Sequence, residues 1–124
     1  MAGKTILYVE DNEANRMIVR DLLKRTKYQL IEAYDGEAGV AKALEARPDL
    51  ILMDIQLPKI SGIEATRRLR GEAATAKTPI VAITSFALSG DDQKAKDAGA
   101  TAYLAKPYSP MDLLKLIRNL LPEG

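Results

Sequence analysis

Five short apolar runs recur along the chain, and polar segments separate them. Several are rich in Ile, Leu and Val, and each is about as long as a β-strand. Because apolar and polar residues rarely alternate within them, the pattern predicts strands covered on both faces, as in a parallel sheet. The second run is the weakest, since Glu32 and Tyr34 interrupt it. The five runs are Thr5–Val9, Gln29–Ala33, Leu50–Met53, Ile80–Thr84 and Ala102–Ala105.

Helical patterns occupy the segments between these runs. Asn12 is a good N-cap for the first helix, which is expected to carry Ile18, Val19, Leu22 and Leu23 on one apolar face. The other four helices are expected from Asp35-Gly36 to a point before Pro48, from about Gly62 to Gly71, from about Ser89 to Ala98, and from Ser109-Pro110 to Pro122.

Strand and helix therefore alternate five times, which is typical of a doubly wound α/β fold with helices on both faces of a parallel sheet. Right-handed crossovers restrict the topologies that such a chain can adopt. The chain has 124 residues, a length typical of one domain, and no linker, low-complexity tract or internal repeat divides it. We expect one domain over residues 1–124 and no second domain.

The composition limits the chemistry that the chain can perform. It has no Cys, His or Trp, so thiol catalysis, imidazole catalysis and zinc sites built from these ligands are excluded. Any metal must be a hard cation that accepts oxygen ligands. A net charge of +1 gives no reason to expect nucleic acid or a membrane surface as a partner. No apolar segment approaches the roughly 20 residues of a membrane helix, and we expect a cytoplasmic protein.

Chemically useful side chains follow four of the five strands. Glu10 and Asp11 come after the first, Asp54 after the third, Thr84 ends the fourth, and Lys106 follows the fifth. Ligands of open parallel sheets bind outside the carboxyl ends of the strands, so these groups should converge. Mg²⁺ would neutralise the carboxylates, and a carboxylate can accept a phosphoryl group. The predicted chemistry is phosphoryl transfer to an aspartate.

Each of these residues also has an ordinary structural interpretation. Asp11 and Asn12 can cap a helix, and Asp54 can form a turn after its strand. Thr84 can be ordinary loop chemistry, and a lone Lys106 is usually a surface charge. The functional interpretation is favoured because all of them are expected at a single edge of the sheet.

Four segments resemble the receiver domains of response regulators, the CheY-like family. The resemblance implies a flavodoxin-like sheet of five parallel strands in the order 2-1-3-4-5. Within the family, the chain is most similar to the DivK group of stand-alone bacterial receivers. The segments are VEDN at 9–12, LILMDIQLPKISG at 50–62, AITSFA at 82–87 and YLAKPYS at 103–109.

The resemblance implies a phosphorylation site and a metal site. Asp54 would be the residue that accepts the phosphoryl group. Asp11, Asp54 and the backbone carbonyl of Gln56 would bind Mg²⁺, and Glu10 would act on the ion through water. The family most often has two aspartates where this chain has Glu10-Asp11, so the longer side chain changes the reach of the first carboxylate.

The resemblance also implies a conformational switch. Lys106 and Thr84 would contact the phosphoryl oxygens, and Tyr103 would turn inward as Thr84 moves. A cis peptide bond would join Lys106 to Pro107, which agrees with the general restriction of cis bonds to X-Pro. Ser85 replaces the alanine that is usual in the family. The helix ending at Ala98 is expected to move, because it has no large apolar residue to anchor it.

The function implied is that of a single-domain response regulator in a two-component system or phosphorelay. The resemblance implies a phosphohistidine as the phosphoryl donor. Because this chain has no His, the donor would be another protein, namely a sensor histidine kinase or a histidine phosphotransfer protein, or a small acyl phosphate. Without an output domain, the signal would pass to a downstream protein by direct contact. Such a protein catalyses only its own phosphorylation and dephosphorylation, and is not an enzyme acting on external substrates.

Three other classes of protein share parts of this pattern. An aspartyl phosphatase of the haloacid dehalogenase type needs a second aspartate where this chain has Gln56. A flavodoxin needs a Ser/Thr/Gly-rich phosphate loop after the first strand, where this chain has Glu10-Asp11-Asn12-Glu13. A receiver-like scaffold that is never phosphorylated remains the main alternative, although such proteins usually lack one of the residues that this chain retains.

Overall fold

A five-stranded parallel sheet forms the centre of the molecule in the computed structural model, which describes residues 3–84 and 90–122. The strand order is β2-β1-β3-β4-β5, which confirms the predicted order. Each strand lies within one residue of its predicted position, and the third includes Asp54 as its last residue. The strands are β1 (Thr5–Val9), β2 (Gln29–Ala33), β3 (Leu50–Asp54), β4 (Ile80–Thr84) and β5 (Ala102–Ala105).

A helix follows every strand. Four of the five helices begin at a side-chain cap, in which Asn12, Asp35, Ser61 or Ser109 accepts a backbone N–H of the first turn. The fourth helix begins after Gly90, and Ser89, where it was expected to start, lies outside the described residues. The helices are α1 (Glu13–Leu23), α2 (Gly36–Ala46), α3 (Gly62–Arg70), α4 (Asp91–Ala98) and α5 (Pro110–Leu120).

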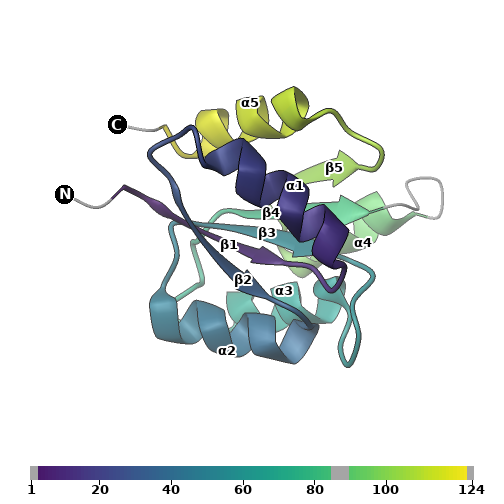
Figure 1. Cartoon of the computed structure of the whole chain (residues 1–124). Coiled ribbons are helices and arrows are strands. Elements are labelled where there is room, and N and C mark those ends of the chain that lie inside the picture. Colours follow the sequence, from purple (N-terminus) through teal and green to yellow (C-terminus); the bar gives the residue numbers. More distant parts are fainter. Residues whose placement is uncertain (1–2, 85–89, 123–124) are drawn as a thin grey trace.

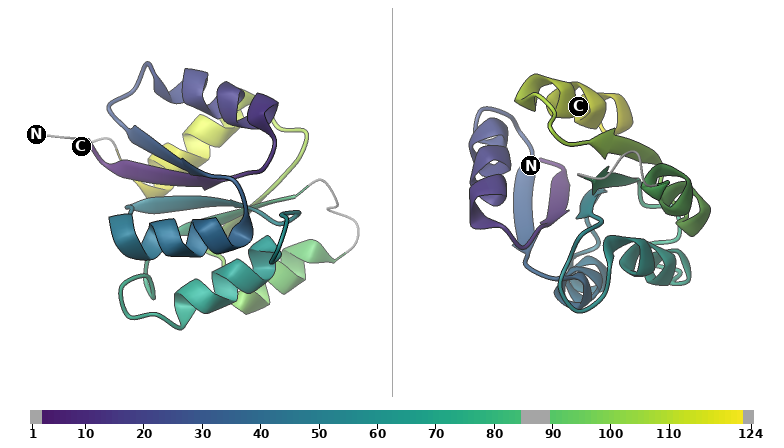
Figure 2. Two further views of the ribbon diagram at one scale, coloured as in Figure 1. Left: turned by 60° about the horizontal axis from the view of Figure 1, so that its bottom comes forward. Right: turned by 90° about the vertical axis from the view of Figure 1, so that its right-hand side faces the viewer.

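The helices cover both faces of the sheet, as Figures 1 and 2 show. Helices α1 and α5 pack on one face, over a core that contains Ile6, Leu52 and Ile83. Helices α2, α3 and α4 lie on the other face, where Leu7 and Met53 belong to a second core. The strands are therefore covered on both sides, which explains why their sequences show little alternation.

Helix α1 differs from its predicted arrangement. Val19 and Leu23 are buried as expected, but Ile18 is 50% exposed. The third buried residue of the helix is Arg16, which is 8% exposed and occupies the position one turn before Val19. The core-facing stripe of α1 is therefore Arg16, Val19 and Leu23, and Ile18 belongs to the outer surface.

Helix α4 is anchored by small side chains along its length and by hydrogen bonds at its end. Ala95 and Ala98 are its buried residues among those described, and Ala95 packs in a small cluster with Ile55. At the C-terminal end, Nε of Arg70 donates a hydrogen bond of 2.8 Å to the carbonyl oxygen of Gly99. The guanidinium of Arg70 also bonds the carbonyl oxygen of Thr78 at 2.7 Å, which ties the end of α4 to the loop before β4.

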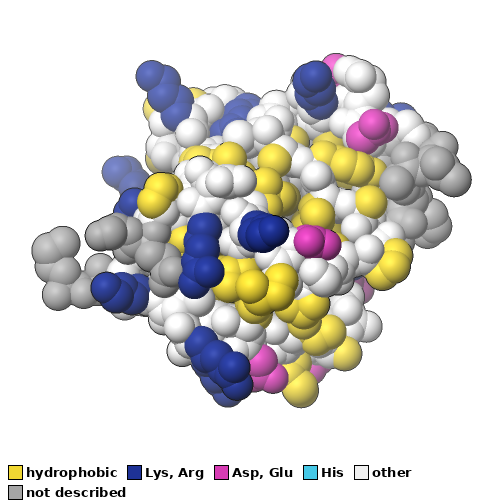
Figure 3. Space-filling model, turned by 90° about the horizontal axis from the view of Figure 1, so that it is seen from above, with side chains coloured by type: hydrophobic (Ala, Val, Ile, Leu, Met, Phe, Trp, Pro, Cys, Tyr) yellow, Lys and Arg dark blue, Asp and Glu magenta, His cyan; other side chains and the backbone are white. Residues whose placement is uncertain are grey.

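The outer surface of α1 and α5 carries exposed apolar side chains. Met17, Ile18 and Met111 are about half exposed, with values of 48, 50 and 58%. A groove of about 450 Å³ runs between the two helices, with Arg25 and Arg118 among its lining residues. Figure 3 views this face and shows apolar side chains gathered across it, with lysine and arginine side chains beside them. No helix among residues 3–84 and 90–122 combines the length and apolar character needed to cross a membrane.

Candidate phosphoryl-accepting site

The side chains expected at the carboxyl edge of the sheet do converge there. Nζ of Lys106 lies 2.8 Å from Oδ2 of Asp54 and 3.0 Å from Oε1 of Glu10, although these residues follow or end three different strands. Glu10, Asp54 and Thr84 are almost fully buried, with exposures of 1, 2 and 0%. Asp11 is exposed and stands next to Glu10 in the loop after β1. The right-hand view in Figure 2 looks onto this edge.

The close packing of two carboxylates and one ammonium changes the acidity of all three groups. Burial and the neighbouring Glu10 carboxylate raise the pKa of Asp54. Burial also disfavours the ionised form of Glu10, but its hydrogen bonds with Asp54 and Lys106 lower its pKa overall. Burial lowers the pKa of Lys106, and its bonds to both carboxylates outweigh that effect and raise it. With both carboxylates ionised the trio carries one excess negative charge, so it attracts a cation.

Gln56 connects the acceptor aspartate to the predicted switch threonine. Its backbone N–H donates a hydrogen bond of 2.9 Å to Oδ1 of Asp54. Its side-chain Nε2 donates to Oγ1 of Thr84 at 3.1 Å. The Thr84 hydroxyl therefore lies within reach of the Asp54 loop and bonds Gln56 in this state.

Gly62 is required where α3 begins, directly beneath the acceptor strand. A Cβ atom on Gly62 would lie 2.0 Å from the carbonyl oxygen of Asp54, a distance that no side chain can occupy. The backbone N–H of Gly62 also donates to the carbonyl oxygen of Ile55 at 2.9 Å. The absence of a side chain lets α3 approach the backbone at Asp54 and fixes the loop that carries Gln56.

The structure describes two more of the predicted features, the Lys106–Pro107 bond and Tyr103. The Lys106–Pro107 peptide bond is cis, as predicted. Tyr103 is partly buried and packs beside the cluster of Ile55, Ala82 and Ala95 on the α4 side of the sheet. Ser85 lies outside the described residues.

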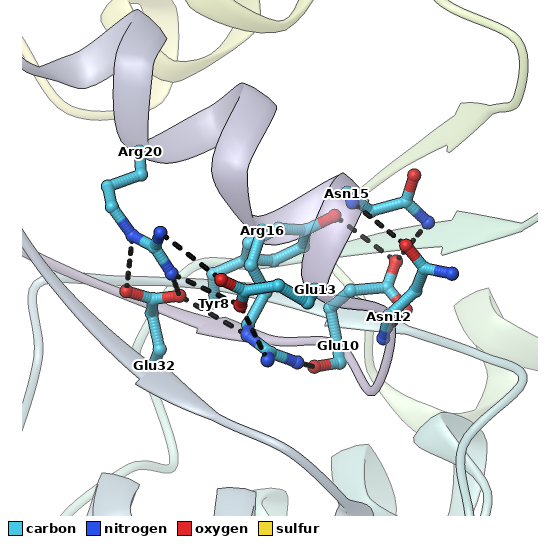
Figure 4. A network of polar contacts seen from close by, with 8 residues as sticks. All are labelled: Tyr8, Glu10, Asn12, Glu13, Asn15, Arg16, Arg20 and Glu32. Atoms are coloured by element: carbon cyan, nitrogen blue, oxygen red, sulfur yellow. Dashed lines mark hydrogen bonds and ion pairs between the residues drawn. The ribbon is translucent and has the colours of Figure 1, made fainter.

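Glu10 is held by donors that the sequence did not reveal. Nδ2 of Asn15 bonds Oε1 of Glu10 at 3.0 Å, and the hydroxyl of Tyr8 donates to the same oxygen at 3.3 Å. The backbone N–H of Asn12 donates to Oε2 at 3.3 Å. Together with Lys106, these groups fix a carboxylate that is one methylene longer than the family's usual aspartate. Figure 4 shows this network at the start of α1.

The oxygen ligands at this edge are suited to a magnesium ion. Within the part of the chain that the structure describes, no three acidic side chains are grouped closely enough to hold a metal by themselves. Mg²⁺ usually takes one or two protein carboxylates and completes its shell with carbonyl groups, phosphate oxygens and water. Buried Asp54, exposed Asp11 and the excess negative charge of the trio match this requirement.

The chain belongs to the response regulator receiver family. The family model for the response regulator receiver domain matches residues 6–118, which include every site residue described above. The fold, with five parallel strands in the order 2-1-3-4-5, and the convergence of Asp54 and Lys106 agree with this assignment. Receiver domains of this family belong to the signalling proteins of two-component systems.

Among curated proteins, the chain is similar to response regulators of the DivK type. It is 40% identical over 121 residues to the polar-differentiation response regulator DivK of Brucella anthropi, and the match covers 98% of each chain. The protein is accordingly a response regulator of phosphorelay signalling.

Solved receiver structures agree closely with the fold. The receiver domain of the sensor histidine kinase PA1611 of Pseudomonas aeruginosa has a TM-score of 0.89 and 37% identity, and the match covers 96% of this chain and 98% of that one. That structure has a magnesium ion coordinated in its active-site cleft. The chemotaxis response regulator CheY4 of Vibrio cholerae has a TM-score of 0.89 and 33% identity, with 95% and 98% of the two chains covered.

Proposed function

We propose that Asp54 accepts a phosphoryl group from a phosphohistidine donor in the presence of Mg²⁺, and that residues 1–124 form one receiver domain. The observation that carries the proposal is the position of Lys106, whose ammonium lies between the buried carboxylates of Asp54 and Glu10. A cation held at an acceptor carboxylate is what phosphoryl transfer needs to stabilise the charge on the transferring oxygens.

Each site residue has a distinct part in the transfer. An ionised oxygen of Asp54 attacks phosphorus, the bond from phosphorus to the donor imidazole breaks, and its electron pair remains on the imidazole nitrogen. Lys106, already beside Asp54, pairs with the new negative charge. Asp11, Asp54 and the carbonyl of Gln56 would hold Mg²⁺, with Glu10 acting through water. When bound, the ion supplies positive charge to the phosphoryl oxygens.

The response to phosphorylation would begin at Thr84. The new group adds about −1.5 to −2 charges and three acceptor oxygens. The Thr84 hydroxyl, now bonded to Gln56, would turn to a phosphoryl oxygen. Tyr103 packs against the small cluster that contains Ala95 of α4, and its ring would turn inward as Thr84 moves. The altered surface would signal to a downstream protein by direct contact, with the receiver in the cytoplasm.

The first experiment measures phosphorylation directly. The protein is incubated with acetyl phosphate and Mg²⁺ and weighed by intact mass spectrometry. We expect a gain of one phosphoryl group, and no gain when a chelator removes Mg²⁺, because the buried carboxylates then lack the cation that offsets the incoming charge. No gain in a folded sample with Mg²⁺ present would favour a scaffold that acts without phosphorylation.

The phosphohistidine partner is proposed to dock on the outer surface of α1 and α5. Exposed Met17, Ile18 and Met111 provide apolar contact area on this face. A second cavity, of about 280 Å³, is lined by Ile18 and Lys106 and joins the apolar surface to the site. A donor bound on this surface would have its histidine close to Lys106, and Lys106 lies 2.8 Å from Asp54.

Ile18→Asp is expected to slow transfer from a phosphorylated histidine kinase by about tenfold, because it places a charge in the apolar centre of the docking surface. The initial transfer rate from radiolabelled kinase measures this effect. Labelling by acetyl phosphate should not change, since a small donor needs no docking surface. Lys42→Asp, an exposed change on α2 at the opposite face of the sheet, is the control. An equal loss with both donors would place Ile18 in the chemistry instead.

A further inference from the structure

Arg16 is a buried cation that the proposed chemistry does not use. Among the described residues it is the one lysine or arginine that is buried, with 8% of its surface exposed. It projects from the core-facing side of α1, next to the edge that carries Glu10 and Asp11. A buried guanidinium is costly unless partners satisfy it, so its contacts should reveal what it is for.

The strongest of these contacts is to the main chain of the acidic loop. Nη1 of Arg16 donates a hydrogen bond of 2.7 Å to the carbonyl oxygen of Glu10. That carbonyl belongs to the peptide that joins Glu10 to Asp11. The hydrogen bond therefore fixes the orientation of this peptide plane and the position of the Asp11 Cα atom. Figure 4 shows the guanidinium reaching this oxygen from α1.

The other side of Asp11 is fixed as well. The side-chain oxygen of Asn12 accepts the backbone N–H of Asn15 at 3.0 Å, and the carbonyl of Asn12 accepts the backbone N–H of Arg16 at 3.1 Å. Asp11 therefore lies between a peptide held by a guanidinium and a residue held by the helix cap. Its side chain is exposed, so the position of the main chain sets the region that the carboxylate can reach.

Three further groups hold the guanidinium in place. Nη2 lies 2.8 Å from Oε1 of Glu13, and Nε lies 3.3 Å from Oε1 of Glu32 on β2. The ring of Tyr34 covers the guanidinium, with its centroid 4.1 Å from the central carbon. Such a planar fork serves several acceptors at once, which a lysine ammonium cannot do with the same geometry.

The local charges indicate that geometry matters more than net charge. Glu13 and Glu32 also pair with Arg20, at 3.4 and 2.8 Å. Two arginines and two glutamates thus form a group with no net charge beside the acidic loop. Removing the positive charge of Arg16 alone would leave an excess negative charge there, which would attract Mg²⁺ more strongly.

We propose that Arg16 is a positioning residue for the metal site, which presents Asp11 to Mg²⁺ by holding the carbonyl group of Glu10. This role rests on the proposed function. The inference goes beyond the proposed function because it assigns control of the Mg²⁺ affinity to a residue of α1 that is not itself a metal ligand. Groups that orient metal ligands typically change metal affinity by about 10- to 100-fold when they are removed.

The test measures Mg²⁺ binding without any phosphoryl donor. Arg16→Lys keeps the charge and loses the fork, whereas Arg16→Gln loses both. A titration with Mg²⁺, followed by the amide NMR shifts of residues 10–12, is expected to give dissociation constants about tenfold above the wild type for both variants. With acetyl phosphate, the Mg²⁺ concentration for half-maximal labelling should rise in parallel, and the rate at saturating Mg²⁺ should be preserved.

Arg20→Lys is the matched control, because Arg20 shares Glu13 and Glu32 with Arg16 but does not bond the Glu10 carbonyl. Its Mg²⁺ dissociation constant is expected to stay within about twofold of the wild type, because lysine keeps the charge and the lost contacts do not reach the acidic loop. A shift as large as that of Arg16→Lys would mean that the network acts through charge or general stability, and would overturn the proposal.

Other results also decide the question. An unchanged dissociation constant in Arg16→Lys, or a tighter one in Arg16→Gln, overturns the positioning role. If neither variant folds, Tyr34→Leu serves instead, because it removes the ring that covers the exposed side of the guanidinium. This variant should weaken Mg²⁺ binding about threefold, the scale of a cation–π contact. Unchanged Mg²⁺ binding in Tyr34→Leu would overturn the positioning role. A wild-type protein that binds Mg²⁺ but gains no phosphoryl group would contradict the proposed function, and the Mg²⁺ titrations would still test Arg16.

Discussion

Asp54→Asn should fold normally and gain no phosphoryl group from acetyl phosphate at any Mg²⁺ concentration. The amide has the size of the carboxylate and can still accept the Gln56 N–H, but it is not a nucleophile towards phosphorus. Intact mass spectrometry with saturating acetyl phosphate measures the effect. Asp21→Asn, an exposed change on α1, is the control and should be labelled like the wild type. A phosphoryl group on Asp54→Asn would contradict the assignment of the acceptor.

The same variant has an expected effect on stability. Because the pKa of Asp54 is raised in the folded protein, its ionised form opposes folding, and this cost appears as the pH rises above the unfolded value. In Mg²⁺-free buffer, Asp54→Asn should therefore be at least as stable as the wild type. Its advantage in urea unfolding should be larger at about pH 8 than at about pH 5.

Lys106→Met is the second change with a large expected effect. It leaves Glu10 and Asp54 buried together without the ammonium that lies within 3.0 Å of both. Breaking a buried ion pair from one side costs about 3 kcal/mol, so the free energy of unfolding in Mg²⁺-free buffer should fall by that order. Labelling by acetyl phosphate should slow by about 100-fold, the scale of losing one donor to the transition-state oxygens.

The two effects of Lys106→Met can be separated. Added Mg²⁺ should restore much of the lost stability, because a divalent cation neutralises the same carboxylates, but it should not restore the labelling rate. Lys115→Met, on the exposed side of α5, should change neither quantity. Unfolding in urea that is insensitive to Lys106→Met would show that the ammonium does not compensate the buried carboxylates.

The fold was largely predictable because its strands are covered on both faces. Unbroken apolar runs such as Leu50–Met53 mark buried parallel strands, and alternation with helices then restricts the topology. The convergence of Asp54 and Lys106 followed from the same topology, since the carboxyl ends of parallel strands meet at one edge. The rule places residues at an edge, whereas the distances of 2.8 and 3.0 Å come from side-chain packing.

The residues that support the site could not be found by that rule. Asn15 contacts Glu10 only because of how α1 lies over the end of β1, which no local pattern encodes. Tyr8 lies two residues before Glu10, but the sequence does not show that its hydroxyl is directed at the carboxylate. One signal was available: Arg16, Val19 and Leu23 lie at helical spacing on a single stripe, so an arginine stands where an apolar residue is usual. The sequence instead predicts an apolar face through Ile18, because helical spacing alone does not separate a core contact from an exposed apolar side chain.

Helix α4 is hydrogen-bonded at its C-terminal end but makes few side-chain contacts along its length. This difference determines how the helix can be displaced. Its C-terminal end is held through the carbonyl oxygen of Gly99, which Arg70 bonds at 2.8 Å. Along its length only alanine side chains are buried among the described residues, so little contact area resists displacement there. We therefore expect any displacement of the helix to pivot at Gly99 and to be largest at Asp91, where the helix begins.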